Sequence, residues 1–533
     1  MLSLRFFLWT CILLLPASPA FSRECPVVHI RLPTPADTAL QSWNLTDAER
    51  LYTSELEKNP AAEVSLSGLI LSQLYQNKTD AALATAQDAI KRLPASATLL
   101  ADLAQIQFRT GDLAATRASL LRAMALDHCN ARVYFVFATY LQASSLKASA
   151  RDRINTAHQL SPDDPQIYSA WLSNQPLAIR IAALKKALEV ADLSAGEKES
   201  LSSQIDRLET IRKAESEHGR CKVVSTAPSM KLPFTYILEG PEVIKAFGLD
   251  VRINNKATAR LEIDTGASGI IIRRGLASKA GLVPLTHNKF YGIGDEGAQT
   301  SYSALADDLK IGQFEFKNCV VEVSDKRSVA NEDGLIGGDV FKDYLLTIDF
   351  PERLIRVDPL PQRPGEKQEA TITSEGDADD EPSPLDAYVA PSMKDWTHVL
   401  RFGHNLMVPV GLGDSRTHWF ILDTGAFTTT LSPATARAIT KVSRDRDLRV
   451  EGLSGKVNEV FAAKNVEIAF GGVRQKLTDA VVISMDNMSR STGVEASGFL
   501  GFGTLRFLVM QIDYRDALVH FEYDPKHGEN RRF

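Results

Sequence analysis

The spacing of apolar residues divides the chain into a helical front part and two later segments of a different kind. Over residues 40–215 the chain is rich in Ala, Leu and Gln and poor in Gly. Its apolar residues recur at helical spacing, for example Leu99, Leu103 and Ile106 at i, i+4 and i+7. Turn-forming stretches such as Asn77-Lys78-Thr79-Asp80 separate these segments. The pattern predicts an all-α domain over residues 40–215.

The predicted helices come in pairs that repeat along the chain. Leu93-Pro94, Leu126-Asp127 and Leu160-Ser161 end successive pairs at nearly equal offsets. A helix–turn–helix unit with a period of about 34 residues resembles the tetratricopeptide repeat, although the full consensus is absent. Such units stack into a curved solenoid, whose expected role is to hold a partner, a substrate segment or another copy of the chain. An irregular helical bundle is the alternative.

After Cys221 the pattern changes to short β-branched runs punctuated by glycine, over residues 230–360 and again over 396–527. These runs predict two β-rich domains. Residues 361–395, between them, contain the acidic, proline-containing stretch 375–382 and few large apolar side chains. We interpret this region as a solvated linker, with a loop inserted on the surface of a β domain as the alternative.

The two β-rich segments share a series of landmarks. Asp264-Thr265-Gly266-Ala267 recurs later in the chain as Asp423-Thr424-Gly425-Ala426, and each copy follows an alternating apolar strand. Glycine-containing turns follow in both segments, with Gly292 and Gly452 at nearly equal distances from their aspartates. Near their ends, both segments contain an apolar-Leu/Ile-Gly motif, in the stretches 334–339 and 498–503. The shared order and spacing indicate two copies of one domain.

Both copies resemble lobes of the aspartic peptidase superfamily, and are closer to its retropepsin-like branch than to pepsin. The paired Asp-Thr-Gly-Ala motifs, a glycine-rich flap in each copy and the apolar-Leu/Ile-Gly motifs carry this resemblance, which covers more than half of the chain. It implies two all-β lobes that follow the helical repeats and pair within one polypeptide. A catalytically inactive retained fold is the alternative, as is a peptidase that becomes active only as a homodimer.

The resemblance implies that Asp264 and Asp423 activate a water molecule together, and it implies no metal and no cofactor. The glycines of the motifs let the backbone turn tightly beneath the carboxylate, where a Cβ would crowd the facing lobe, and the threonines can exchange hydrogen bonds across the lobe interface. The expected supporting residues of these loops are Thr265, Gly266, Ser268, Thr424 and Gly425. The possible flap residues are Tyr291, Gly292, Gly294, Gly452 and Gly455.

The two copies differ directly after the shared motif, where the first has Ser268 and the second has Phe427. A serine hydroxyl can donate a hydrogen bond to a neighbouring carboxylate and favour its ionised form, whereas phenylalanine cannot. We therefore predict that Asp264 is the more acidic member of the pair and that Asp423 carries the proton.

Composition adds limits to this interpretation. The length of 533 residues indicates two to four domains, and 44% hydrophobic with 24% charged residues is typical of a soluble globular protein. A net charge of −6 gives no reason to expect nucleic acid as a partner. The ten histidines form no HExxH motif, and His404 and His418 are expected to be surface or packing residues.

The N-terminus has the layout of a secretory signal peptide over residues 1–22. Arg5 precedes the apolar run 6–15, and the small residues 17–22 offer cleavage sites. We therefore expect export to a periplasm or the cell exterior. An uncleaved anchor is the alternative, although this run is shorter than the ~20 residues that span a bilayer. No later segment is apolar enough to do so.

Four cysteines follow this peptide: Cys25, Cys129, Cys221 and Cys319. They form no CxxC pair, so a zinc site is not expected. An exported chain permits disulfides, with three possible pairings, and buried free thiols are the alternative.

The sequence as a whole predicts an exported aspartic endopeptidase with polypeptide substrates, in which the helical repeats recruit a substrate or a protein partner. The alternative is a catalytically inactive protein-binding module built from the solenoid and the double lobe.

Overall fold

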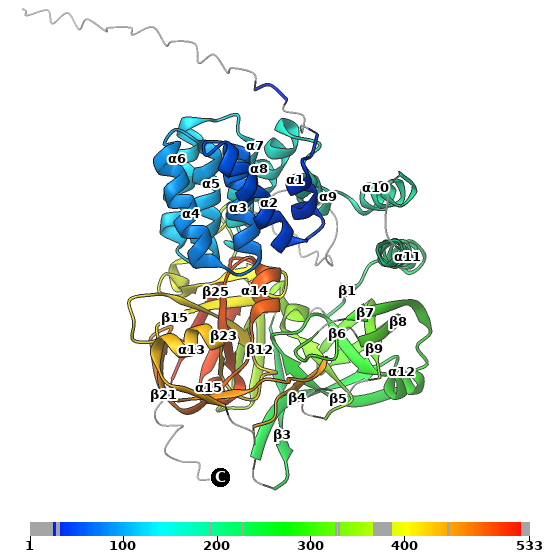
Figure 1. Ribbon diagram of the computed structural model, residues 1–533. Helices are drawn as coiled ribbons and strands as arrows, with labels where there is room; N and C mark the ends of the chain where they lie inside the picture. Colours follow the sequence, from blue (N-terminus) through cyan, green and yellow to red (C-terminus); the bar gives the residue numbers. More distant parts are fainter. Residues whose placement is uncertain are drawn as a thin grey trace, which may run out of the picture.

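A computed structural model describes residues 25–27, 32–190, 195–225, 229–241, 243–290, 292–297, 299–325, 328, 331–365, 386–444 and 448–523. The expected signal peptide, most of the acidic linker and Tyr291 lie outside these residues. A helical part stands on a β-rich part (Figure 1). The second lobe, coloured yellow to red, lies beneath the helices, and the first lobe, coloured green, lies beside the second.

The helical part confirms the expected all-α front of the chain. Its helices are α1 (Pro35–Gln41), α2 (Leu45–Lys58), α3 (Glu63–Tyr75), α4 (Thr79–Arg92), α5 (Ala97–Arg109), α6 (Leu113–Leu126), α7 (Ala131–Ala143), α8 (Lys147–Leu160), α9 (Pro165–Ser173), α10 (Leu177–Val190) and α11 (Ala195–His218).

The helix pairs repeat in their caps and turns as well as in their length. Ser96, Asn130 and Asp164 follow one another at the repeat period, and the side chain of each caps a helix by accepting a hydrogen bond from the backbone N–H three positions later. The turns inside the pairs contain Asn77, Gly111 and Ser145 at the same period, with φ of 60°, 77° and 59°. The repeat is therefore present in the geometry of the caps and turns, whereas the sequence indicated it only through the spacing of the helix ends.

The first lobe is built mainly of β-strands. Its elements are β1 (Lys222–Val223), β2 (Met230–Pro233), β3 (Thr235–Glu239), β4 (Val243–Ile253), β5 (Ala257–Asp264), β6 (Ile270–Arg273), α12 (Arg274–Ala280), β7 (Pro284–Phe290), β8 (Gln299–Ile311), β9 (Phe314–Ser324), β10 (Gly334–Gly337), η1 (Gly338–Phe341), β11 (Tyr344–Asp349) and β12 (Leu354–Pro359). The sheet order is β1-β9-β6-β10-β5-β4-β8-β7, with β3 paired to β4.

The second lobe repeats this plan with shorter strands. Its elements are η2 (Pro391–Met393), β13 (Thr397–His398), β14 (Leu400–Phe402), β15 (Asn405–Val410), β16 (His418–Asp423), β17 (Thr430–Leu431), α13 (Pro433–Ile439), β18 (Val442–Arg444), β19 (Glu451–Gly452), β20 (Gly455–Lys456), β21 (Phe461–Phe470), β22 (Val473–Val482), α14 (Asp486–Thr492), β23 (Ala496–Gly501), α15 (Phe502–Leu505), β24 (Val509–Asp513) and β25 (Leu518–Glu522). Its central sheet has the order β14-β15-β16-β23.

A shared sheet joins the lobes. Its order is β13-β25-β24-β11-β12-β2, and β11 of the first lobe pairs antiparallel with β24 of the second. Leu346 faces Ile512 and Ile348 faces Met510 in this register, and all four side chains are buried. The backbone ladder and this apolar face therefore fuse two lobes into one β body.

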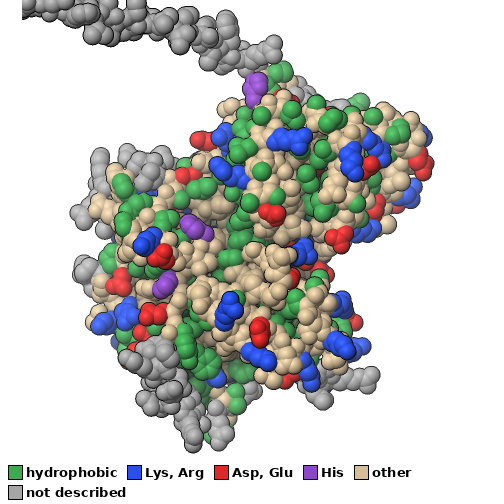
Figure 2. Space-filling view, turned by 90° about the vertical axis from the view of Figure 1, so that its left-hand side faces the viewer, with side chains coloured by type: hydrophobic (Ala, Val, Ile, Leu, Met, Phe, Trp, Pro, Cys, Tyr) green, Lys and Arg blue, Asp and Glu red, His purple; other side chains and the backbone are tan. Residues whose placement is uncertain are grey.

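The turns of the solenoid dock on the second lobe. The Trp419 indole donates a hydrogen bond to the Gly111 carbonyl at 3.1 Å, and the Glu495 N–H donates to the Arg109 carbonyl at 2.7 Å. The Arg109 guanidinium in turn donates to the Ser489 carbonyl. Phe108 of α5 is buried in one apolar cluster with Trp419 and other residues of the lobe. The view in Figure 2, from the left-hand side of Figure 1, shows the helical part seated directly on the β part, with acidic and basic side chains interspersed.

The two ends of the predicted linker that the structure describes are held in place. Arg363 forms a buried ion pair with Asp516 of the second lobe. The Asp386 carboxylate accepts hydrogen bonds from the N–H groups of Ala148 and Ser149, at 2.7 and 2.9 Å, and so caps the N-terminus of α8. The two described ends are therefore fastened to the second lobe and to the solenoid, respectively.

The cysteines that the structure describes are paired. Cys25 is bonded to Cys129, and Cys221 is bonded to Cys319. The second bond joins the segment after α11 to β9 of the first lobe. The alternative of buried free thiols is therefore wrong for these four residues. Among the described helices, none is both long enough and apolar enough to cross a bilayer.

The docking contact at Gly111 gives a prediction about stability. Its φ is +77°, and an added Cβ would lie 2.2 Å from Nε1 of Trp419. We expect Gly111→Ala to lower the free energy of unfolding by about 2 kcal/mol or more, from strain and from displacement of the indole. Gly196→Ala in α11 is the matched control, because nothing lies within 4 Å of its added Cβ. Thermal melts of both variants measure this, and equal melting temperatures would contradict it.

Candidate active site

The two motif aspartates occupy the same topological position in their lobes. Asp264 ends β5 and Asp423 ends β16. Each of these strands runs parallel to the strand with the apolar-Leu/Ile-Gly motif, so that Asp264 is level with Gly337 and Asp423 with Gly501. A Cβ on Gly337 would lie 2.5 Å from the Ala267 carbonyl oxygen. The motif glycine therefore lets the aspartate loop pass against the neighbouring strand.

The lobes bring both aspartates to one place. A Cβ on Gly266 would lie 2.7 Å from Cγ of Asp423, and a Cβ on Gly425 would lie 2.4 Å from Cγ of Asp264. Each glycine thus lies directly against the carboxylate of the other lobe. The two carboxyl groups are also hydrogen bonded to one another. Asp264 and Asp423 are called the dyad below.

The threonines of the two motifs make the expected exchange of hydrogen bonds. The Thr265 hydroxyl donates to the Leu422 carbonyl at 2.9 Å and accepts from the Thr424 N–H at 3.0 Å. The Thr424 hydroxyl donates to the Ile263 carbonyl at 2.9 Å and accepts from the Thr265 N–H at 3.1 Å. Both threonines are buried, so these bonds hold the two motif loops in a fixed position relative to each other.

The dyad is electrostatically asymmetric. Burial raises the pKa of Asp264 well above its usual value, and the negative charges of Asp423 and Glu262 raise it further. The Gly266 N–H, 2.8 Å from the Asp264 carboxylate, offsets only part of this. These causes favour a proton on the Asp264 carboxyl group.

Burial also raises the pKa of Asp423, but several groups oppose that rise. The Ala426 N–H donates to the Asp423 carboxylate at 2.8 Å, and a hydrogen bond from Asp264, the Gly425 N–H and the charge of His404 act in the same direction. These groups therefore offset part of the rise in the pKa of Asp423. Two carboxyl groups this close to each other share one proton between them.

The contact on which the prediction of a more acidic Asp264 rested is not formed. Ser268 does not serve its carboxylate: the Ser268 hydroxyl donates instead to Asp339 at 2.7 Å. The Gly269 N–H donates to the same Asp339 carboxylate at 2.8 Å. Ser268 therefore helps to attach the motif loop to Asp339 and does not serve the dyad. Phe427, the counterpart in the second lobe, is 39% exposed.

The glycine-rich turns expected to form flaps meet tip to tip. The Gly292 N–H donates to the Ser454 hydroxyl at 2.8 Å, and the Ser454 N–H donates to the Ile293 carbonyl at 2.9 Å. The Asp295 N–H donates to the Lys456 carbonyl at 3.0 Å. The turn between β7 and β8 is thereby joined to the hairpin β19–β20 of the other lobe.

The close crossing of the tips explains their glycines. A Cβ on Gly294, whose φ is +130°, would lie 2.4 Å from the Gly455 carbonyl oxygen. A Cβ on Gly452 would lie 2.4 Å from the Ile293 carbonyl oxygen. All four predicted flap glycines therefore take part in this crossing, and Gly292 does so through its N–H as well.

One residue next to the dyad was missed by the sequence interpretation. His404 lies in the turn between β14 and β15, and its Nε2 is 3.2 Å from the Gly266 carbonyl oxygen. No motif or spacing marks this histidine, so only the folded arrangement identifies it. His418, by contrast, is buried and paired with Asp414 at 3.0 Å, as a packing residue would be.

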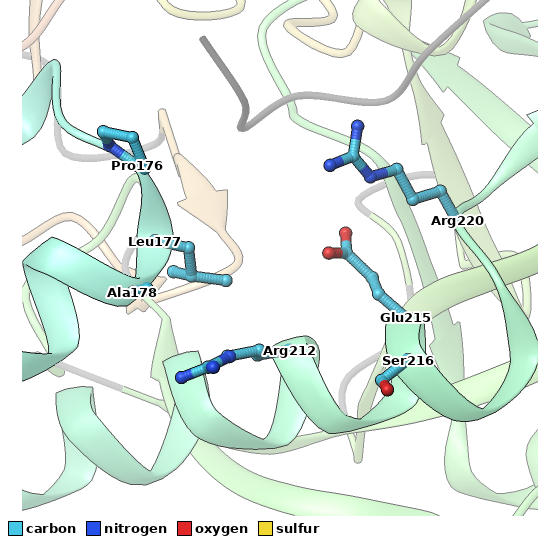
Figure 3. Close-up of a pocket in the computed structure, with 7 residues that line it drawn as sticks. All are labelled: Pro176, Leu177, Ala178, Arg212, Glu215, Ser216 and Arg220. Atoms are coloured by element: carbon cyan, nitrogen blue, oxygen red, sulfur yellow. The ribbon is translucent and has the colours of Figure 1, made fainter. Parts of the chain in front are cut away.

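The cavities described are distinct from the dyad. A cavity of about 330 Å³ lies between the start of α10 and the end of α11 and is lined by Pro176, Leu177, Ala178, Arg212, Glu215, Ser216 and Arg220. Figure 3 shows the side chains of Arg212 and Arg220 on opposite sides of the Glu215 carboxylate. A second, of about 80 Å³, lies where the solenoid meets the second lobe and is lined by residues such as Thr110, Trp419 and Ser497.

Comparison with known families now adds to this geometry. A family model described as "Aspartyl protease" matches residues 249–340 and 408–503, one segment in each lobe. The two lobes match the aspartyl protease family. Each matched segment contains its dyad aspartate and its apolar-Leu/Ile-Gly motif, and the helical repeats lie outside both.

Two solved structures are similar to parts of this chain. An aspartic proteinase from Irpex lacteus has 10% identity and a TM-score of 0.33, with 56% of this chain and 99% of that chain covered. A retropepsin-like aspartic protease from Rickettsia conorii has 19% identity and a TM-score of 0.19, with 26% of this chain and 93% of that chain covered. A comparison with curated proteins gives no match.

The protonation of the dyad predicts a pH-dependent stability. The pKa of Asp264 is raised in the folded chain, so the folded chain keeps a proton that the unfolded chain loses above about pH 4. The contribution of Asp264 to folding is therefore complete below that pH and falls as pH rises through the raised pKa. We expect Asp264→Asn to melt at a higher temperature than the wild type at pH 7, and at a similar temperature at pH 4.

Asp250→Asn provides the control, since Asp250 is largely exposed and forms a surface pair with Arg260. That change should alter the melting temperature only slightly, because surface ion pairs contribute about 0–1 kcal/mol. A wild type more stable than Asp264→Asn at pH 7 would contradict the assignment.

Proposed function

We propose that this protein is an exported aspartic endopeptidase that hydrolyses peptide bonds with the dyad of Asp264 and Asp423. One observation carries the proposal: two lobes of a single chain bring these carboxyl groups together, each against the motif glycine of the other lobe. The match of both lobes to aspartyl proteases supports the same chemistry.

We propose a role for each carboxyl group from the groups that surround it. Asp423, ionised, takes a proton from a water molecule as the water oxygen attacks the carbonyl carbon of the peptide. Asp264, protonated, donates its hydrogen to the carbonyl oxygen and so stabilises the developing tetrahedral species. When the carbon–nitrogen bond breaks, the proton held by Asp423 passes to the leaving amine. Asp264 then recovers its proton from the collapsing hydroxyl group.

A single chain is sufficient for this chemistry. The threonine exchange and the β11–β24 ladder hold the lobes together, so neither aspartate needs a second copy of the chain. We therefore propose a monomeric active species. The joined flap tips imply that a polypeptide enters only after the hydrogen bonds between the turns at Gly292 and Ser454 have opened.

The helical repeats fit a recruiting role in this proposal. They are docked on the second lobe through Trp419, Glu495 and Ser489, and so would present a bound segment at a fixed position relative to the dyad. Solenoids of this kind bind extended segments on their curved surfaces.

The hydrolytic activity is tested with unfolded casein over acidic to neutral pH. We expect cleavage by the wild type, and a loss of roughly 10³-fold or more in both Asp264→Asn and Asp423→Asn, because the two carboxyl groups act as one unit. Asp250→Asn should retain full activity. The active species should elute as a monomer in size-exclusion chromatography.

Absence of cleavage by the folded wild type at every pH would reject the peptidase proposal and favour a protein-binding module. Activity that appears only in a dimer fraction would reject the one-chain dyad.

Export is proposed from two features. Residues 1–22 have the layout of a signal peptide, and the described cysteines form disulfides, which persist in oxidising compartments. We expect the full chain, expressed in a host with a secretory pathway, to leave the cytoplasm with its new N-terminus near residue 21 or 23. A chain that starts at residue 25 should stay in the cytoplasm. Fractionation and N-terminal sequencing measure this, and an exported chain that lacks residues 1–24 would contradict it.

A further inference from the structure

His404 belongs to the second lobe but contacts the motif loop of the first. Its Nε2 lies 3.2 Å from the Gly266 carbonyl oxygen. Because a carbonyl oxygen only accepts hydrogen bonds, this contact requires a proton on Nε2. Gly266 is the residue that lies directly against the carboxylate of Asp423. The imidazole is therefore hydrogen bonded to the residue that lies against Asp423, the proposed base.

The turn that presents His404 is rigidly held. It is a two-residue turn between Phe402 and Asn405, with Gly403 at a φ of +62° in its first central position. The buried Arg401 guanidinium donates to the Gly403 carbonyl at 2.8 Å and to the Tyr514 carbonyl at 2.7 Å. These bonds fix the turn to the shared sheet, so the position of the imidazole is set by the lobe interface.

The corresponding turn of the first lobe contains no histidine. It lies between β3 and β4 and includes Gly240 and Pro241. The contact therefore acts on one side of the dyad only. This one-sidedness matches the asymmetry of the pair, in which the positive charge of His404 lowers the pKa of Asp423 and Glu262 raises that of Asp264.

We propose that His404 is a cross-lobe positioning residue, which holds the Gly266 loop against the Asp423 carboxylate. This inference rests on the proposed peptidase function. Among the described residues, the charged groups near the imidazole include Asp423 of the same lobe and Arg401 of its own hairpin, which is engaged with backbone carbonyls.

The sign of the effect follows from the dyad. Activity on the acidic side is lost when Asp423 takes up a second proton for the pair. A nearby positive charge opposes this uptake, so the acidic limb of the pH–activity profile lies at a lower pH when His404 is charged. Removing that charge should move the acidic limb toward higher pH.

The test compares three substitutions at His404. His404→Gln keeps an N–H donor for Gly266 but removes the charge, and we expect its acidic limb to move up by roughly 0.5–1 pH unit. His404→Arg keeps both donor and charge and should restore the wild-type limb. His404→Leu removes both and should lower kcat at every pH, with a smaller change in KM. His398→Gln is the matched control, because His398 is an exposed histidine of the same lobe.

A second measurement separates this inference from the peptidase proposal. The carboxyl carbons of Asp264 and Asp423 are titrated by NMR in the wild type and in the same variants. An upward shift of the Asp423 titration in His404→Gln, absent in His398→Gln, supports the inference even if the wild type cleaves nothing. Unchanged titration and an unchanged acidic limb in His404→Gln would overturn it, and so would a failure of His404→Arg to restore the limb.

Discussion

Two carboxyl groups held against each other at the junction of two lobes are the constraint on which much of this structure depends. Unit charges about 4 Å apart near a protein surface repel by the order of 4 kcal/mol, and burial adds to that cost. The repulsion is relieved because the pair keeps a proton, but the contact must still be enforced. The threonine exchange does this next to the dyad, and the β11–β24 ladder does it further away. The glycines at 266 and 425 then remove the side chains that would otherwise separate the two loops.

Sequence symmetry does not carry through to electrostatic symmetry. The two motifs are identical, and each aspartate accepts a hydrogen bond from a backbone N–H of its own loop at 2.8 Å. The difference arises from groups outside the motif, namely Glu262 behind Asp264 and His404 across from Asp423. The division of labour between base and acid in the proposed reaction is therefore set by the surroundings. Two copies of one lobe can therefore acquire different roles when only the residues around the shared motif differ.

The parts of the fold that could be predicted from the sequence are those whose pattern occurs in it more than once. The duplicated landmarks predicted two β lobes, and the regular recurrence of helix ends predicted helical repeats, because each pattern appears more than once. Single contacts between distant segments gave no such signal. The Ser268 hydroxyl pairs with Asp339, far along the chain, and not with the motif aspartate of its own loop. The cysteine pairing, the Trp419–Gly111 contact and His404 likewise depend on how lobes pack, which periodicity does not encode.

The attachment of the helical part bears on how a substrate could reach the dyad. The repeats dock on the second lobe through Gly111 and Trp419, whereas the segment after α11 is bonded to the first lobe by Cys221 and Cys319. The same helical part is thus fastened to both lobes, in addition to their shared sheet. Separation of the lobes would have to break these contacts together with buried apolar pairs such as Ile348 and Met510. The flap tips, in contrast, are joined mainly through hydrogen bonds between short turns. Opening at the flaps costs far less burial than opening at the lobes, so substrate entry is expected to leave the dyad assembled.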